Sequence, residues 1–551
     1  MRSSDEGVGT STAIPGLESH LVGLMSFLAL LLLVVIPCLV LLPVAWKLSA
    51  PLNDVPYNKT WNPLGDVLGL LRASTPVDYF SQQVEKHGAI CQLRLGPMGR
   101  VILVADPKEI EENLQKRAEN FDKAKVVREA FVGTLRQGSV GLAAKEQWKL
   151  HRRMMTPSMS PTYLATRMNQ ICANVQKLLD IWAVKSRLAS KYDATFECDD
   201  DIERFAMDSI MAVMLGENLH CLEDTYKSLN SLTTSELSQQ GVLRLSAPFS
   251  RNYRNFRYLL QGMGSALRSG APALVYGVLN LLPGWRTARR ECYQFIESKL
   301  EQHSGGDSFV DRLLSRYPDG RPEGVSPSAL LDEFATFIIG GADTPSTVMS
   351  WIIKYLTMHP QVQNRLHSEL SASFKLSNNF SVTLEELQDG GFAYLDAVIH
   401  EVLRLANVGG VSARDALHDV TISGCQIPKG SQVFFLTGHS GISNAPPVED
   451  SGITSGTFYP ERWLKEESDG SFSFSSNGIP SFPFGHGPRG CPGQRFAMLE
   501  LKAFLLAFNL TFFLEETVEA TDAQAEMLVV LRKPSRMCIK IRKWEDGRVG
   551  I

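Results

Sequence analysis

Three features that mark other classes of protein are missing from this 551-residue sequence. It lacks a basic excess, since 55 lysine and arginine residues face 59 aspartate and glutamate residues, for a formal net charge of -4. Dedicated nucleic-acid binders are usually strongly basic, so no nucleic-acid partner is expected. The nine cysteines form no CxxC pair and no cysteine-dense block, which argues against zinc modules and disulfide scaffolds and favours a reducing compartment. No internal repeat is present either.

The composition that remains is that of a globular protein. Hydrophobic residues make up 44% of the chain and charged residues 21%, with a mean hydropathy of -0.06. A chain of this length and composition can bury a large core, which excludes disordered, collagen-like and coiled-coil proteins.

One long uncharged run lies near the N-terminus, at residues 21–46. Its 26 residues contain no charge, and as a helix they would extend roughly 39 Å, enough to cross a bilayer. A cleaved signal peptide is the alternative, but the acidic residues Asp5, Glu6 and Glu18 precede the run and it is too long. The sequence therefore predicts an N-terminal tail at 1–20 and a transmembrane anchor at 21–46.

The rest of the chain reads as a short linker followed by one domain. More positive charge follows the anchor than precedes it, which favours a cytosolic C-terminal part. Pro51 and Pro56 stiffen a linker at 47–61, and 62–551 shows no further break in composition. Helical periodicity dominates at 164–182, 329–358 and 392–405, while strand-like runs are short, as at 90–95, 101–104 and 433–436. We expect a mostly α fold with small β-sheets.

A glycine-rich loop near the C-terminus carries one cysteine, Cys491, just before a helical run at 494–508. The N–H groups and the positive dipole end of that helix would lower the pKa of the thiol. The surrounding glycines would let the backbone approach a flat, bulky group, and a haem iron bound by thiolate fits these features. The alternative is a buried structural thiol, the usual fate of a lone cysteine.

This loop resembles the haem-binding loop of the cytochrome P450 family, which has the form F-x-x-G-x-R-x-C-x-G. The matching residues are Phe484, Gly487, Arg489, Cys491 and Gly493. The resemblance covers roughly residues 62–540 and implies a cytochrome P450-like fold, with 62–551 as a haem-thiolate catalytic domain. It also implies haem b as cofactor, with Cys491 as the axial iron ligand and the loop residues Phe484, Gly485, Arg489 and Gly493 against the haem.

Two further segments match the family and carry supporting residues. Glu401 and Arg404 lie three residues apart, on one face of a predicted helix, and Arg462 follows in a Pro-Glu-Arg segment. In the family such residues form a buried structural triad, so we expect Glu401, Arg404 and Arg462 to support the haem loop and not to be catalytic.

The predicted helix 329–358 contains an unusual stretch from Gly340 to Thr347. Two glycines, and Pro345 without an N–H group, indicate a kink or a helix break. The stretch resembles the A-G-x-D-T-T motif of the family, with Asp343 and Thr344 at the acid and alcohol positions. The resemblance implies that this pair delivers protons to the dioxygen that the enzyme reduces. Pro345 departs from the usual second threonine or serine.

Four other residues match family contacts to the haem propionates. Trp148 and Arg152 lie four residues apart and so project from one helix face, and guanidinium groups bind carboxylates well. Arg489 and Arg414 fit the remaining propionate positions. Lys149 and Arg153 project about 100° away, where they would either dock an acidic electron donor or form a solvated charged face.

The middle of the domain, residues 191–327, matches the family least, although the family's substrate-contacting helices lie there. The apolar segment 271–285 is too short to span a bilayer. Three arginines follow it closely. It would either dip into a membrane surface or form buried core.

Together these features predict a haem-thiolate monooxygenase that inserts one oxygen atom of dioxygen into a lipophilic substrate, such as a sterol or fatty acid. Electrons would come from NADPH through cytochrome P450 reductase or a similar partner. We expect a single-pass protein of the endoplasmic reticulum membrane with its catalytic domain in the cytosol. The alternatives are a reductase-independent hydroperoxide isomerase or dehydratase on the same fold, and a non-catalytic haem-binding protein.

Overall fold

The structure is a computed structural model and describes residues 50–544, except for 60–61, 63, 74, 97–98, 232–240, 244–248, 303–306, 318, 375–379, 390, 407, 439–452, 454–455, 518–524, 529–530 and 536. The predicted tail at 1–20 and anchor at 21–46 lie outside the described residues, as does the start of the linker. Within the described part of the chain, no helix has the length and apolar character needed to span a bilayer.

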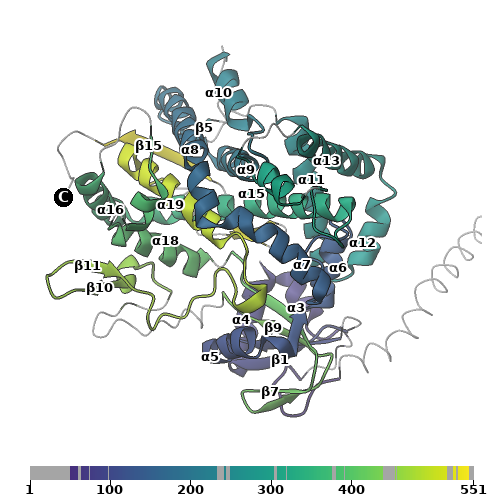
Figure 1. The fold of residues 1–551 in the computed structure, drawn as a ribbon. Helices are drawn as coiled ribbons and strands as arrows, with labels where there is room; N and C mark the ends of the chain where they lie inside the picture. The colour runs from purple at the N-terminus through teal and green to yellow at the C-terminus, as the bar shows by residue number, and fades with distance from the viewer. Residues whose placement is uncertain are drawn as a thin grey trace, which may run out of the picture.

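Helices make up most of the described chain, as the periodicity predicted (Figure 1). Their bounds are α3 Val67–Arg72, α4 Pro76–His87, α5 Pro107–Glu111, α6 Lys125–Val132, α7 Glu146–Met155, α8 Pro161–Ser190, α9 Asp199–Leu215, α10 Cys221–Ser231, α11 Arg251–Arg268, α12 Pro272–Leu279, α13 Pro283–Glu301, α14 Phe309–Arg316, α15 Pro327–Met358, α16 Pro360–Ser373, α17 Leu384–Asp389, α18 Ala393–Ala406 and α19 Gln494–Thr511.

The strands are short and form small sheets. Their bounds are β1 Ile90–Arg94, β2 Arg100–Val104, β3 Phe121–Lys123, β4 Thr195–Glu197, β5 Val242–Leu243, β6 Ser412–Ala416, β7 Val420–Ile422, β8 Cys425–Ile427, β9 Gln432–Phe435, β10 Leu464–Glu466, β11 Phe472–Phe474, β12 Phe512–Glu515, β13 Ala525–Leu528, β14 Leu531–Pro534 and β15 Cys538–Lys543. The fold is therefore mostly α with small β-sheets, as expected.

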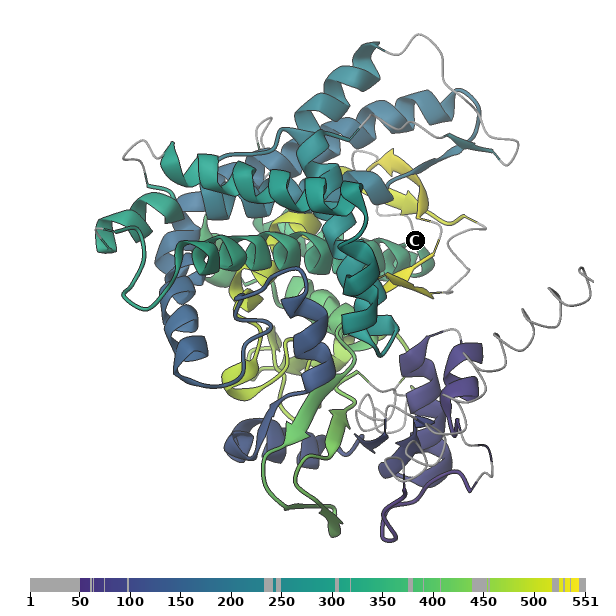
Figure 2. The same cartoon turned by 90° about the vertical axis from the view of Figure 1, so that its right-hand side faces the viewer.

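The largest sheet has five strands in the order β1-β2-β9-β6-β3. Strands β2 and β9 are parallel, whereas β1–β2, β9–β6 and β6–β3 are antiparallel. This sheet lies with α3, α4 and α5 at the lower end of the molecule, below the large group of helices (Figures 1 and 2). Strand β3 is one of the two edge strands, and its partner β6 belongs to a segment almost 300 residues further along the chain.

Helix α15 forms the centre of the helical part and packs most extensively against α9. It begins at a capping serine, Ser326, whose hydroxyl accepts the Ala329 N–H, with Pro327 in the first turn where its missing N–H costs nothing. Of the two alternatives for the Gly340–Thr347 stretch, a kink or a helix break, the break is excluded, because α15 runs unbroken through Pro345. Nearby hydroxyls bond to the helix carbonyls, as Thr347 Oγ1 does to the Asp343 carbonyl at 2.9 Å.

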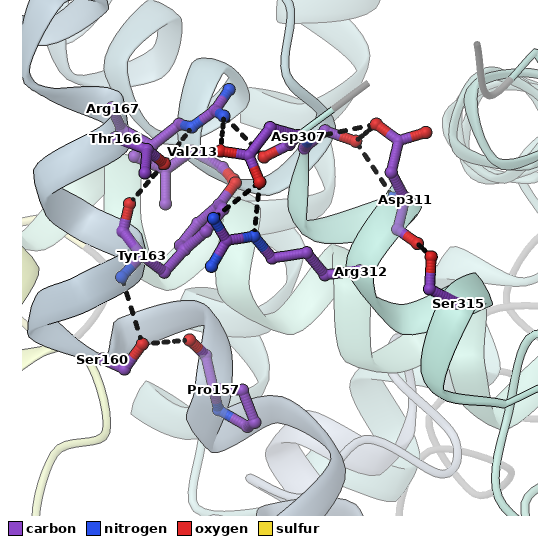
Figure 3. Close-up of polar contacts among 11 residues, drawn as sticks. Pro157, Ser160, Tyr163, Thr166, Arg167, Val213, Asp307, Asp311, Arg312 and Ser315 are labelled. Carbon is purple, nitrogen blue, oxygen red and sulfur yellow. Dashed lines mark hydrogen bonds and ion pairs between the residues drawn. The ribbon is translucent and has the colours of Figure 1, made fainter. Parts of the chain in front are cut away.

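One polar cluster joins α8, α9 and α14 on the side of the molecule drawn in Figure 3. The Tyr163 hydroxyl donates to the Val213 carbonyl, and the guanidinium groups of Arg167 and Arg312 lie 5.2 and 4.9 Å from the Tyr163 ring centroid. Both arginines also contact Asp307. The cluster holds the start of α8 against neighbouring helices and is structural.

Candidate active site

Cys491 is delivered by a tight loop that ends just before α19. Gly487 adopts a φ of +67°, and a Cβ atom there would lie 2.0 Å from the Leu114 carbonyl oxygen, so no larger residue fits without movement of the backbone. The Cys491 N–H donates to the Phe484 carbonyl at 2.8 Å, which closes the loop. The predicted loop and the following helix are therefore both present.

The Cys491 thiol opens into a cavity of about 440 Å³. It is accessible because it lines the cavity, and protein surrounds it otherwise. The predicted direction of its pKa is wrong: burial raises the pKa, while the N–H groups of Gly493 and Gln494 and the charge of Arg152 oppose that rise only in part. A metal cation on the sulfur would supply the missing stabilisation of the thiolate.

The loop residues singled out in the sequence line this same cavity. Phe484, Gly485, Arg489 and Gly493 all contribute to its wall, next to Cys491. Trp148 and Arg152 from α7 line it as well. Arg152 donates to the Gly490 carbonyl at 2.7 Å, so α7 is bonded directly to the cysteine loop.

Positive charge is concentrated at one end of the cavity. Arg489 donates to Asp122 Oδ1 and to the Leu142 carbonyl, both at 2.8 Å, and its guanidinium lies 4.3 Å from the Trp148 ring centroid. Arg414 is buried nearby, and burial together with the charge of Arg489 lowers its pKa to about 10. The arginines predicted for propionate binding are thus brought together.

Lys123 belongs to this group of cations, although no motif drew attention to it. It lines the cavity, and its Nζ donates to the Val140 carbonyl at 2.8 Å. Burial first, and then the charges of Arg489 and Arg414, lower its pKa to about 7. The β3–β6 register pairs Lys123 directly with Arg414, a juxtaposition that depends on tertiary pairing and leaves no signal in the sequence.

The acid and the alcohol of α15 line the cavity too. The Thr344 hydroxyl donates to the Gly340 carbonyl at 2.6 Å. Asp343 is buried, with 9% of its surface exposed, and burial, helped by the nearby negative charge of Glu203, raises its pKa to about 7. Such a carboxyl can both give and accept a proton near neutral pH.

Apolar side chains from two helices complete the cavity, and the sequence did not single them out. Leu260, Met263 and Leu267 come from α11, within the segment that matched the family least, and Ala130 and Phe131 come from α6. Their spacing is that of ordinary buried helix faces, so only the fold reveals their place beside Cys491.

The predicted triad is assembled away from the cavity. Glu401 accepts from Arg404 Nη2 at 2.7 Å and from Arg462 Nε at 3.0 Å, and Trp463 Nε1 adds a third donor at 2.9 Å. The Glu401 side chain is fully buried. Arg462 thereby ties the segment before the cysteine loop to α18.

A haem group fits these residues on three observations. The thiol is accessible from within a cavity. Lys123, Arg152 and Arg489 line that cavity, and Arg414 is buried close to Lys123 and Arg489, so a group carrying two carboxylates would balance their charge. The Arg489 Nε atom is also buried without a hydrogen-bond partner in the described structure, which leaves a donor for an incoming carboxylate.

A mostly helical fold with a cysteine loop facing an apolar, cation-capped cavity defines the class of haem-thiolate proteins. The family profile described as Cytochrome P450 matches residues 55–540. The chain therefore belongs to the cytochrome P450 family, and it is an oxidoreductase enzyme of that family. Its members bind haem through a cysteine thiolate.

Relatives from fungi and mammals are similar over most of their length. The chain is 27% identical to "Cytochrome P450 monooxygenase GME11363" of Pestalotiopsis microspora, over 86% of this chain and 91% of that protein. It is 25% identical to "Cytochrome P450 4V2" of Rattus norvegicus, over 89% and 93%. A solved structure, "Crystal structure of cytochrome P450DA heme domain", shares the fold with a TM-score of 0.70 at 17% identity, covering 89% of this chain and 97% of that chain.

Proposed function

We propose that this P450 is a membrane-anchored haem-thiolate monooxygenase that uses electrons from a reductase to oxygenate a lipophilic substrate. The observation that carries the proposal is that Cys491 and the pair Asp343 and Thr344 line one and the same cavity. When bound, the haem supplies the iron at which dioxygen is activated.

The protein residues have separate tasks in this proposal. Cys491 is the iron ligand, and Arg152, Arg489, Arg414 and Lys123 hold the haem carboxylates, with Trp148 packed against the Arg489 guanidinium. Phe484, Gly485 and Gly493 shape the loop against the haem. Glu401, Arg404 and Arg462 support the loop from outside the cavity.

Asp343 and Thr344 carry protons. A carboxyl with a pKa of about 7 is half protonated at neutral pH, which is the state that general acid catalysis requires. This pair is what favours a monooxygenase over the two alternatives: a hydroperoxide isomerase or dehydratase needs no such donor, and a non-catalytic haem protein needs neither the pair nor the accessible thiol.

The cavity wall favours a lipophilic substrate such as a sterol or fatty acid. Away from the cationic end, its lining is dominated by aliphatic and aromatic side chains, including Phe131, Leu260, Met263, Phe337 and Ile339. Burial of apolar substrate surface against such walls is favourable by about 25 cal/mol per Å², whereas burial of an unpaired charge there is unfavourable.

Membrane attachment is supported by exposed apolar side chains in the described part of the chain. The α12 segment exposes Leu274, Val278 and Leu281 at 74%, 61% and 77%, while Tyr276 and Trp285 face the core. On α3, Leu71 is 76% exposed. These side chains suit shallow insertion beside an anchor at 21–46, with the domain on the cytosolic face of the endoplasmic reticulum. In this proposal the exposed side chains of 271–285 contact the membrane, while Tyr276 and Trp285 belong to the core.

The electron donor would be an NADPH-dependent cytochrome P450 reductase or a similar protein. Lys149 and Arg153 on α7 are the candidate contact residues: Lys149 is solvent-exposed and pairs with the neighbouring Glu146 at 2.7 Å. That local pair weakens the charge available to a partner.

The test is the carbon monoxide difference spectrum of the reduced protein with its haem. A strongly red-shifted Soret band is expected for the wild type and for Cys425→Ala, a half-exposed cysteine elsewhere, and is expected to be lost in Cys491→Ala. Incorporation of labelled dioxygen into product, dependent on reductant, then identifies a monooxygenase. A band that persists in Cys491→Ala would refute the proposed ligand, and product formed from a hydroperoxide without reductant would favour the isomerase.

A further inference from the structure

Asp343 also lines a second cavity, of about 30 Å³. A cavity of this size admits a water molecule when polar groups surround it, and here Glu203, Tyr253, Arg257 and Ser346 contribute to the wall. Glu203 comes from α9, whereas Tyr253 and Arg257 come from α11. Asp343 therefore borders both the cavity of Cys491 and a small chamber whose wall combines these polar groups with apolar side chains such as Met207 and Phe256.

Glu203 is held firmly at the far side of this chamber. Its carboxylate accepts from Lys533 Nζ on β14 and from the Tyr253 hydroxyl, both at 2.8 Å, and lies 3.5 Å from Arg257 Nη1. Burial acts to raise the pKa of Glu203, but Lys533 and Arg257 outweigh it and hold that pKa below its usual range. Glu203 is thus an ionised carboxylate facing a partly protonated one.

The same charges connect Glu203 to the surface. Arg257, whose side chain is 34% exposed, also pairs with Asp200 at 3.5 Å. Lys533 pairs with Asp199 at 2.8 Å, and burial raises the pKa of Asp199 to about 6. Both aspartates at the start of α9 reach solvent, so titratable groups extend from the surface to the chamber.

We propose that Glu203 passes protons from the surface to Asp343 through water in the small chamber, with Lys533 and Arg257 holding it in position. The inference rests on the proposed role of Asp343 as a proton donor, and Glu203 acts only through Asp343. The step moves protons alone. A hydronium ion from solvent gives its proton to Glu203 and leaves water. Glu203 then passes that proton through the chamber water to the Asp343 carboxylate and is left ionised again.

A purely structural role is the alternative, because the same ion pairs join α9, α11 and β14. The groups that face Asp343 are Glu203 and Asp199 from α9, Arg257 from α11 and Lys533 from β14. If Glu203 is only structural, its variants should lose stability, and proton delivery should change only together with that loss. If Glu203 is a relay, proton delivery should change even in a variant whose stability is unchanged.

The test compares Glu203→Gln with the wild-type holoenzyme. Glutamine keeps the size of the side chain but cannot carry the proton, so we expect about a tenfold lower yield of product per reductant and a larger solvent isotope effect. Infrared titration of the Asp343 carboxyl, identified with Asp343→Asn, needs no turnover. Its midpoint should fall, because Glu203 no longer opposes ionisation of Asp343 while Lys533 and Arg257 still favour it.

Two further variants separate the relay from folding effects. Ala342→Val fills the small chamber without altering any charge. It should reproduce the low yield, while loss of the chamber water raises the Asp343 midpoint instead of lowering it. Tyr253→Phe removes one hydrogen bond of Glu203 but keeps the relay, so its yield should equal that of the wild type.

The outcomes are distinguishable. Wild-type yield in Glu203→Gln, or in Ala342→Val, would overturn the relay even if the Asp343 midpoint moved. A loss of yield in Tyr253→Phe equal to that in Glu203→Gln would assign the cluster a structural role. Absence of reductant-dependent product in the wild type would instead overturn the proposed function. Even then, an Asp343 midpoint in Glu203→Gln equal to that of the wild type would refute the electrostatic coupling between Glu203 and Asp343.

Discussion

Lys123, Arg152 and Arg489 line the main cavity with Arg414 buried nearby, and among the described ion pairs Asp122 pairs with Arg489 alone. Near Asp343, by contrast, the cations are paired with carboxylates of the protein. Repulsion among the first group contributes to the lowered pKa values of Lys123 and Arg414, which is the mark of a site built for an added anion. Near Asp343, Lys533 pairs with Glu203 and Asp199. The cationic residues of the main cavity need the haem carboxylates for charge balance. The charges near Asp343 are balanced by other side chains of the protein.

Arg489→Gln should have the largest effect, on the cationic end. Hydrogen bonds to charged groups contribute about 1.5–3 kcal/mol, so haem binding should weaken about 10- to 100-fold, measured by the rate of Soret loss to a haem acceptor. Arg495→Gln, an exposed arginine in the first turn of α19, is the matched control. Equal haem retention in both variants would show that the cationic residues do not need the haem carboxylates for charge balance, which contradicts the difference drawn between the two regions.

Thr344→Ala should leave haem binding intact and lower the yield of product per reductant by about tenfold, with peroxide released instead. Thr336→Ala is the control, because Thr336 lines the same cavity from the same helix and its hydroxyl likewise bonds the carbonyl four residues earlier, but Ala335 and not an acid precedes it. Loss of haem in Thr344→Ala would contradict the proposed separation between haem binding at the cationic residues and proton delivery at Asp343 and Thr344.

Lys123→Met should have a moderate effect that depends on pH. The Lys123 pKa of about 7 would rise beside a bound carboxylate, so haem binding takes up a proton and weakens as pH rises above about 7. The variant should lose this pH dependence, whereas the exposed Lys125→Met should keep it. If the haem affinity of the wild type does not vary with pH, the haem carboxylates do not lie beside Lys123.

Glu500→Gln should have the smallest effect and tests a buried acid outside both regions. Burial raises the pKa of Glu500 well above its usual range, against a smaller opposing effect of Ser209. Since the unfolded carboxyl titrates near about 4.3, the wild type loses stability as pH rises above that value, and glutamine removes the loss. The variant should therefore melt higher than the wild type at about pH 8 and equally at about pH 4, with the exposed Glu85→Gln unchanged at both.

Local sequence was sufficient for elements whose residues are neighbours in the chain. The helices predicted at 164–182 and 329–358 appear within α8 and α15, and the one at 392–405 matches α18 to within one residue at each end, because a helix satisfies its hydrogen bonds within itself. The cysteine loop was predictable for the same reason. The sequence left a kink or a break open at Pro345, and only the structure excluded the break. Side-chain hydroxyls bond to the helix carbonyls there, and α15 stays continuous at a residue that disfavours helix.

By itself, the sequence determined the family, the cysteine loop, the acid-alcohol pair and the triad members, because each is a pattern of close spacing or of ordered motifs. The tertiary structure alone decided that Lys123 pairs with Arg414 across β3 and β6, and that Glu203 shares a chamber with Asp343. It also decided the Cys491 pKa, whose direction follows from burial more than from the helix end. Desolvation and long-range charge depend on what surrounds a group in space, and that is set by packing between segments far apart in the chain.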